Sequence, residues 1–84
     1  MKTIKYTVTT ASAVKIYDKV NFEQEIIVHN NNANKMYLGG SDVSSTNGFH
    51  LKSDENIKIR VQQDNELYAI SDTTTGDVVV LQNI

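Results

Sequence analysis

Apolar side chains recur at every second position in eight short runs along this chain, and clusters of turn-forming residues separate the runs. A period of two is the spacing of side chains along one face of a β-strand. Ile57, Ile59 and Val61, for example, alternate with charged or polar neighbours. The eight runs cover residues 4–9, 14–17, 22–29, 36–38, 49–52, 57–62, 67–69 and 78–81.

The segments between the runs are rich in Asn, Asp, Gly, Ser and Thr, which favour turns. The pair Gly39-Gly40 suits a bulge or a corner, and Asn47-Gly48 suits a type I′ hairpin turn with positive φ at both central residues. Helical periodicity is absent from every window of the sequence. The chain is therefore predicted to be a single all-β domain over residues 1–84. We expect an antiparallel β-sandwich, jelly-roll-like, of about eight short strands.

One alternating set of apolar side chains is expected to fill the space between the sheets. This predicted core comprises Phe22, Ile26, Val28, Leu38, Phe49, Leu51, Ile57, Ile59, Val61, Leu67, Ala69 and Val80. A domain of 84 residues has a thin core, and the chain contains no cysteine that could form a disulfide. Chains of this kind often gain stability by association, so a homo-oligomer is expected.

Charge and hydropathy argue against two classes of partner. The formal net charge is -2 and the eight Lys and Arg residues are scattered, whereas binding to a phosphate backbone needs clustered cations. Apolar runs are far shorter than a membrane-spanning helix requires. The N-terminal residues lack the apolar stretch of a signal peptide. Neither nucleic acid nor a membrane is therefore an expected partner.

Candidate catalytic and metal-binding groups have simpler interpretations. His29 and His50 each lie beside apolar neighbours, with no spacing that completes a metal site. The acidic segment 72–77 lacks the alternating ligands of a calcium loop and reads as a connection between the last two strands. Carboxylate pairs at 54–55 and at 64 and 66 fall in predicted turns. We therefore predict no catalytic residue, no metal site, no cofactor and no enzymatic activity.

Four tyrosines leave two interpretations open. Tyr6, Tyr17, Tyr37 and Tyr68 all lie in predicted strands. They could form a sugar-stacking or protein-binding platform, because aromatic residues are enriched at interfaces. They could equally pack at the edge of the core.

The order of short motifs resembles a family of small tailed-phage virion proteins, found as head-fibre or capsid-decoration components. The motifs that carry the resemblance are Tyr6-Thr-Val-Thr-Thr10, Ile26-Ile-Val-His-Asn30, Tyr37-Leu-Gly39, Val43-Ser-Ser-Thr-Asn-Gly48, Leu51, Leu67-Tyr-Ala-Ile70 and Val78-Val-Val-Leu81. Together they cover nearly the whole chain.

The resemblance implies a non-enzymatic virion structural protein, synthesised in the host cytoplasm, that binds the major capsid protein or another virion protein. It also makes a trimer the expected homo-oligomer, because a trimer matches the local threefold axes of a capsid shell. The alternative is a carbohydrate- or receptor-binding module of a phage tail or adhesion device. Apolar residues off the core face, together with two tyrosines, are the candidate interface for a partner or a second copy. They are Ile27, Tyr17, Tyr37, Val79, Leu81 and Ile84.

Overall fold

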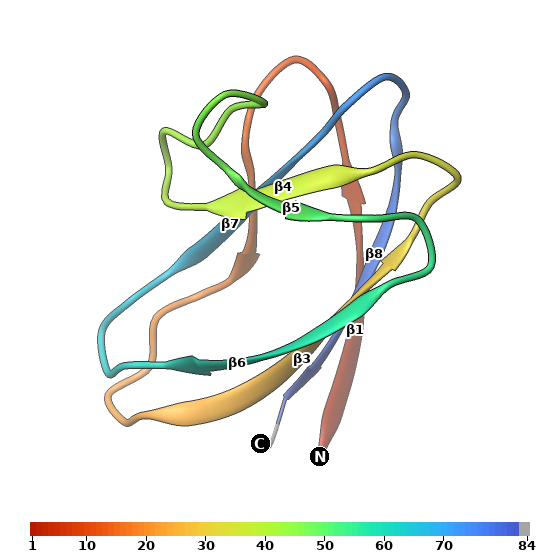
Figure 1. Cartoon of the computed structure of the whole chain (residues 1–84). Coiled ribbons are helices and arrows are strands. Elements are labelled where there is room, and N and C mark those ends of the chain that lie inside the picture. The colour runs from red at the N-terminus through yellow and green to blue at the C-terminus, as the bar shows by residue number, and fades with distance from the viewer. Residues whose placement is uncertain (83–84) are drawn as a thin grey trace.

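The computed structural model describes residues 1–82, and over this range the chain forms eight β-strands and no helix (Figure 1). This confirms the all-β prediction. The strands are β1 (Lys2–Val8), β2 (Val14–Tyr17), β3 (Gln24–Asn31), β4 (Met36–Gly39), β5 (Phe49–Leu51), β6 (Asn56–Val61), β7 (Leu67–Ser71) and β8 (Gly76–Gln82).

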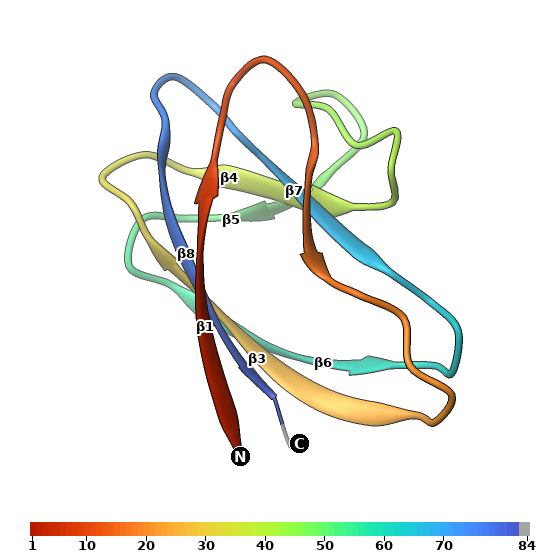
Figure 2. The same ribbon diagram turned by 180° about the vertical axis from the view of Figure 1, so that it is seen from behind.

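The strands build two four-stranded antiparallel sheets that pack face to face (Figures 1 and 2). One sheet has the order β1-β8-β3-β6 and the other the order β2-β7-β4-β5. The chain passes to the opposite sheet after every strand except β4, which pairs with β5. This order of strands is that of a jelly roll, so the predicted β-sandwich is confirmed.

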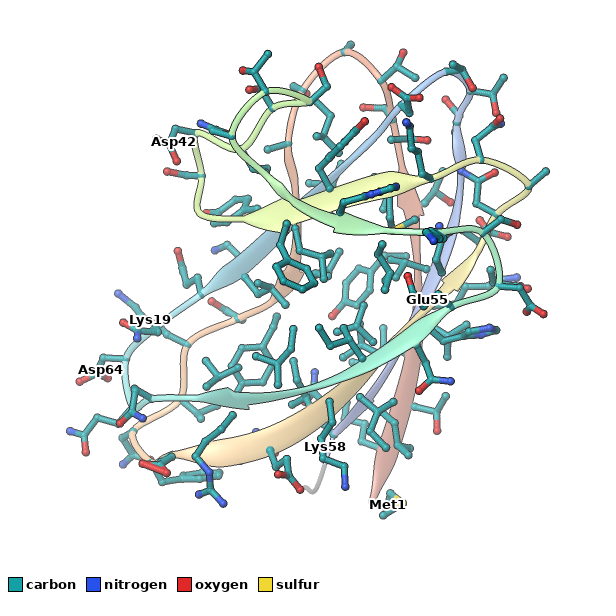
Figure 3. The ribbon with its side chains drawn as sticks, in the orientation of Figure 1. Met1, Lys19, Asp42, Glu55, Lys58 and Asp64 are labelled. Carbon is teal, nitrogen blue, oxygen red and sulfur yellow. The ribbon has the colours of Figure 1, made fainter. Side chains whose placement is uncertain are left out.

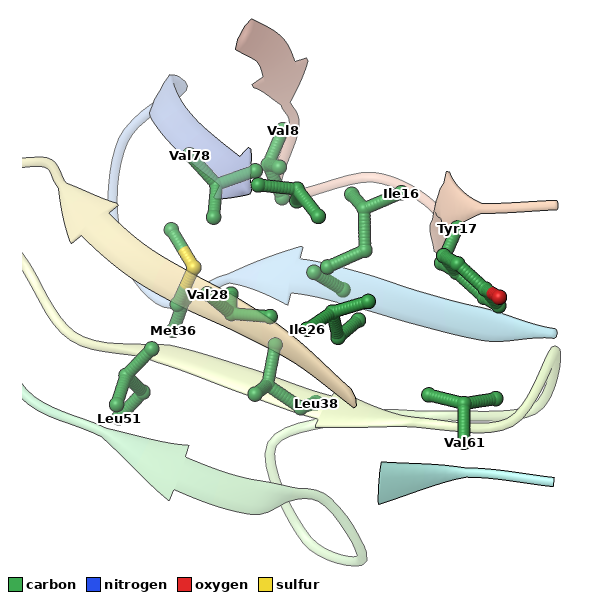
Figure 4. Packing of buried hydrophobic residues seen from close by; sticks show 12 residues of the cluster. Val8, Ile16, Tyr17, Ile26, Val28, Met36, Leu38, Leu51, Val61 and Val78 are labelled. Carbon is green, nitrogen blue, oxygen red and sulfur yellow. The ribbon is translucent and has the colours of Figure 1, made fainter. Parts of the chain in front are cut away.

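Aliphatic side chains from both sheets meet in the layer between them (Figure 4). The prediction is confirmed for seven buried residues, namely Ile26, Val28, Leu38, Leu51, Val61, Ala69 and Val80. Five further buried members of the cluster were not on the predicted list, namely Val8, Ile16, Tyr17, Met36 and Val78. Ile57, Ile59 and Leu67 pack against this cluster but are only partly buried.

The prediction of burial is wrong for two residues, Phe22 and Phe49. Phe22 is 41% exposed because it lies in the bend before β3 and not in a strand. Phe49 is 60% exposed although it pairs with the buried Leu38 and points to the same side of its sheet. Its strand, β5, is the outermost strand of that sheet, and the sandwich is open beside it. The alternation of side chains placed Phe49 on the correct face of its strand, but no strand among the described residues lies on the open side of β5 to cover its ring.

The predicted type I′ turn at Asn47-Gly48 is also wrong. Among the described residues, positive φ angles occur at Asp54 and Asp64 and at no glycine. Residues 40–48 instead form a longer loop between β4 and β5 that folds back over the outer face of the second sheet. At Gly48 this loop passes so close to the sheet that a Cβ atom would lie 2.4 Å from the Tyr37 Cβ atom.

Gly48→Ala is therefore expected to lower the free energy of unfolding by about 1–3 kcal/mol, the usual cost of forcing an extra methyl group into a packed site. Urea denaturation would measure the change. Gly40→Ala is the matched control, since its Cβ would meet a first neighbour only at 3.4 Å. Equal unfolding midpoints for the two variants would contradict the packing role of Gly48.

Candidate functional site

The outer face of the β1-β8-β3-β6 sheet carries a small apolar centre. Ile27 on β3 pairs directly with Leu81 on β8, and His29 pairs with Val79 two residues along. Side chains at odd-numbered positions of these two strands point to the same face, away from the core. Ile27, Val79 and Leu81 are therefore neighbours. We call these three half-buried residues the apolar patch.

The apolar patch forms the floor of two adjoining hollows. The first, of about 220 Å³, is lined by Ile27 and Leu81 together with residues from the chain start, β3 and β6. The second, of about 450 Å³, is lined by all three patch residues and by Thr3, His29 and Asn56. Because the two hollows share Ile27 and Leu81, they form one shallow depression that extends across all four strands of the sheet.

Two ion pairs and a histidine–carboxylate contact surround the apolar patch. Lys5 approaches Asp77 at 4.0 Å, Lys58 approaches Glu25 at 4.0 Å, and the Nε2 atom of His29 lies 3.0 Å from a carboxylate oxygen of Asp54. Figure 3 shows the Lys58 side chain pointing away from the second sheet.

These pairs are exposed to water, so each contributes little to stability, about 0–1 kcal/mol. An apolar centre with a polar rim of mixed charge is typical of a protein–protein contact surface.

Three of the predicted interface residues are thus brought together, and two others are not. Tyr17 is 1% exposed and its hydroxyl accepts a hydrogen bond from Gln24 Nε2 at 2.8 Å, so it belongs to the core. Tyr37 lies on the second sheet and is 9% exposed, because the 40–48 loop and His50 cover it. Both predictions are corrected. Ile84 lies outside the described residues.

The four tyrosines do not form one platform. Tyr6 faces the interior from β1, and burial, with a smaller contribution from Asp18, raises the pKa of its phenol. Tyr17 is in the core. Tyr37 and Tyr68 lie on the outer face of the other sheet, where the Tyr68 hydroxyl donates to Glu66 Oε1 at 3.2 Å. A common sugar-stacking surface is therefore not assembled by these residues.

The two histidines lie on different sheets. His29 is on β3, whereas the ring of His50 on β5 stacks on Tyr37 with centroids 5.8 Å apart. Within residues 1–82, no three His, Cys, Asp or Glu side chains gather closely enough to hold a metal ion.

Lys15 on the edge strand β2 forms ion pairs with two acidic residues, Glu66 and Asp18. Lys15 Nζ lies 3.0 Å from Glu66 Oε2 and 3.4 Å from Asp18 Oδ1. The hydrogen bond with Glu66, followed by attraction to the nearby negative charges, raises the pKa of Lys15. The positive charge of Lys15 in turn lowers the pKa of Asp18. All of these groups reach solvent, so the cluster is a surface ion-pair network at the sheet edge.

No helix in the described part of the chain is long and apolar enough to cross a membrane. A scan against protein-family models finds no match to the chain, and no curated protein matches its sequence.

Proposed function

We propose that this chain is a non-enzymatic structural protein of a tailed-phage virion, which decorates the capsid or builds a head fibre by binding the capsid surface. The observation that carries the proposal is the apolar patch at the centre of the outer sheet face. Two further points support it. The order of the sequence motifs resembles that of small virion proteins, and the jelly roll is a fold that viral capsid domains use. The second point is an analogy of fold.

The size of the outer face bears on how it would bind. Four strands spaced about 4.8 Å apart, each about seven residues long, present roughly 400 Å². A stable interface buries about 800 Å² on each partner, which is one sixth of the 4807 Å² surface of this chain. One face alone is therefore too small for a tight contact with a single partner molecule, whereas in a closed trimer each copy contacts two neighbours. Several weak contacts that form at the same time would bind strongly. Once one contact has formed, the others are held close to their binding sites at a high effective concentration.

A trimer meets this requirement. Three copies whose patches of Ile27, Val79 and Leu81 converge on a threefold axis would bury their apolar side chains against one another. The trimer would then present three identical surfaces to a local threefold position of a capsid shell, where the same contact is repeated three times. In this arrangement the patch holds the trimer together and the capsid binds it through avidity.

The test is a double variant, Ile27→Thr with Leu81→Thr, which places a β-branched side chain with high strand propensity at both positions and removes apolar surface. Lys5→Thr, on the same face beside the patch, is the matched control. We expect sedimentation to give three times 9.4 kDa for the parent and the control, and 9.4 kDa for the double variant. We also expect the double variant to bind purified capsids at least about tenfold more weakly, because avidity is lost.

The two readouts separate the parts of the proposal. A parent chain that sediments at 9.4 kDa and is unaltered by dilution would contradict the trimer while leaving the capsid role intact. A parent chain that does not co-sediment with capsids would contradict the virion role itself.

A further inference from the structure

A second apolar surface lies at the open edge of the sandwich, away from the apolar patch. A hollow of about 300 Å³ opens between the two sheets and is lined by Leu38, Gly39, Phe49, Ile57, Ile59 and Leu67. These residues come from β4, β5, β6 and β7. The ring of Phe49 is 60% exposed at its mouth. The hollow explains why Ile57, Ile59 and Leu67 face the core yet remain only partly buried.

The strands beside this hollow are the outermost strands of their sheets. β6 ends the order β1-β8-β3-β6, and β5 ends the order β2-β7-β4-β5. Residues 52–55 join the two strands at one end, and from there the strands diverge (Figure 1). An outermost strand presents a row of backbone N–H and C=O groups that can pair with another strand.

The register of the ladder shows which groups these are. The amide of Asn30 donates to the carbonyl of Glu55 at 2.9 Å, and β3 and β6 stay in antiparallel register from there onward. Backbone groups of successive residues in such a ladder point alternately to its two sides. The groups of Ile57 and Ile59 therefore point to β3, and those of Lys58 and Arg60 point to the open edge.

The side chains of β6 alternate between the two faces of the sheet, perpendicular to the backbone hydrogen bonds. Ile57 and Ile59 face the hollow, whereas Lys58 and Arg60 lie on the outer face of the sheet, 61% and 62% exposed. Arg60 Nη1 donates to Glu23 Oε2 at 2.7 Å, and this hydrogen bond raises the pKa of Arg60. The edge thus combines an apolar inner side with an outer row of two cations, of which Lys58 lies near Glu25 and Arg60 near Glu23 on the side away from the open edge.

We propose that this edge binds an extended segment of a partner polypeptide, which adds a strand beside β6. Its apolar residues, at every second position, fill the hollow against Phe49, Ile57 and Ile59. Its intervening residues are acidic and lie beside Lys58 and Arg60. Strand addition of this kind draws affinity from main-chain hydrogen bonds and specificity from pockets for alternate side chains. The inference does not depend on the virion role, since it concerns a different surface.

Charge selects this occupant over a second copy of the chain. If two copies paired through antiparallel β6 strands centred on Ile59, Lys58 of each copy would lie opposite Arg60 of the other. Like charges directly opposite each other destabilise a strand pair, whereas opposite charges stabilise it.

The probe is a short synthetic peptide of alternating valine and glutamate with blocked ends, followed by amide chemical shifts and hydrogen exchange of the labelled protein. We expect shifts at β6 and at Phe49, and slower exchange of the Lys58 and Arg60 amides. Two control peptides should bind at least about tenfold more weakly. A peptide of the same composition in scrambled order loses the alternation of apolar and acidic side chains, and a peptide with an N-methylated backbone loses the main-chain hydrogen bonds. The double variant Lys58→Glu with Arg60→Glu should prefer a valine–lysine peptide instead.

Three results would overturn the proposal. One is the absence of any change in the amide chemical shifts or hydrogen exchange of β6 when the alternating peptide is present at millimolar concentration. Another is filling of the hollow by a small apolar molecule, such as a fatty acid, that competes with the peptide while the Lys58 and Arg60 amides exchange as before. A third is protection of these amides that rises with protein concentration alone, which would identify a second copy as the occupant. Val79→Thr, on the apolar patch, is the control that should leave peptide binding unchanged.

Discussion

Replacing Asn30 with aspartate is expected to bring this domain close to unfolding at neutral pH. Asn30 is fully buried at the end of β3. Its side-chain amide donates to the carbonyls of Asn34 at 2.9 Å, Leu51 at 3.1 Å and Lys52 at 3.0 Å. This one amide group ties the first sheet to the segment that carries the chain from β5 in the second sheet back to β6 in the first.

An ionised aspartate at this position would have no proton to donate and would face three carbonyl oxygens in a site closed to water. Leaving a buried charge without a partner costs about 3–5 kcal/mol. A domain of 84 residues has a total stability of about 4–13 kcal/mol. We therefore expect urea denaturation of Asn30→Asp at pH 7 to show a midpoint far below that of the parent chain.

The pH dependence gives this prediction a second readout. Burial beside carbonyl oxygens raises the pKa of the new carboxyl in the folded state above its unfolded value of about 3.9. The folded variant then binds more protons than the unfolded variant, so its stability falls as pH rises from the unfolded value towards the raised one. Relative to the parent at the same pH, the deficit should be smallest at pH 3 and 4 and largest at pH 7.

Asn31→Asp is the matched control, because Asn31 is the next residue and is exposed. Its unfolding midpoint should stay close to that of the parent at every pH. If Asn30→Asp behaved like Asn31→Asp, the buried amide would not hold the two sheets together.

Alternation along the chain was enough to predict which face of a strand each residue occupies, and much of the fold followed from it. Ile27, Val79 and Leu81 were expected off the core face, and the register of β3 with β8 places them side by side. The pairing of strands that brings positions 27 and 81 together is not local in sequence. The contact between Ile27 and Leu81 therefore depends on the topology of the sheet. The period of the apolar residues and the turn residues indicate a class of folds, but they do not specify which strands pair.

Residues at the margins of strands were predicted less well, for reasons that are physical. Phe49 has the parity of a core residue, but burial also requires a neighbouring strand, and β5 has one on a single side. Tyr37 has the parity of a surface residue, but the 40–48 loop covers it. Gly48 could have given a signal for this loop, since a glycine is needed for close approach as well as for positive φ. The apolar hollow beside β6 left no signal in the alternation, because its lining residues look like ordinary core positions.

The open edge leads to the second large effect, a contrast between two isoleucines that face each other across one ladder. Ile26 on β3 and Ile59 on β6 are paired residues on the inner face of the same sheet. Ile26 is 0% exposed and belongs to the buried cluster, whereas Ile59 only packs against that cluster and lines the hollow. Sequence alone gives the two residues the same role.

Ile26→Ala is expected to lower the free energy of unfolding by about 2–5 kcal/mol, the sum of lost burial and the cavity left in a closed core. Ile59→Ala should cost clearly less, about 1–2 kcal/mol. The Ile59 side chain buries less apolar surface than that of Ile26, and the space left by its removal is open to solvent. Urea denaturation of the two variants, analysed with a common slope, measures the difference. The same substitution in two paired residues also holds β-propensity nearly constant, so the contrast reports burial. Equal losses would mean that the side of the sandwich beside β6 is closed in solution, and the hollow proposed as a strand-binding site would then be occupied by the chain itself.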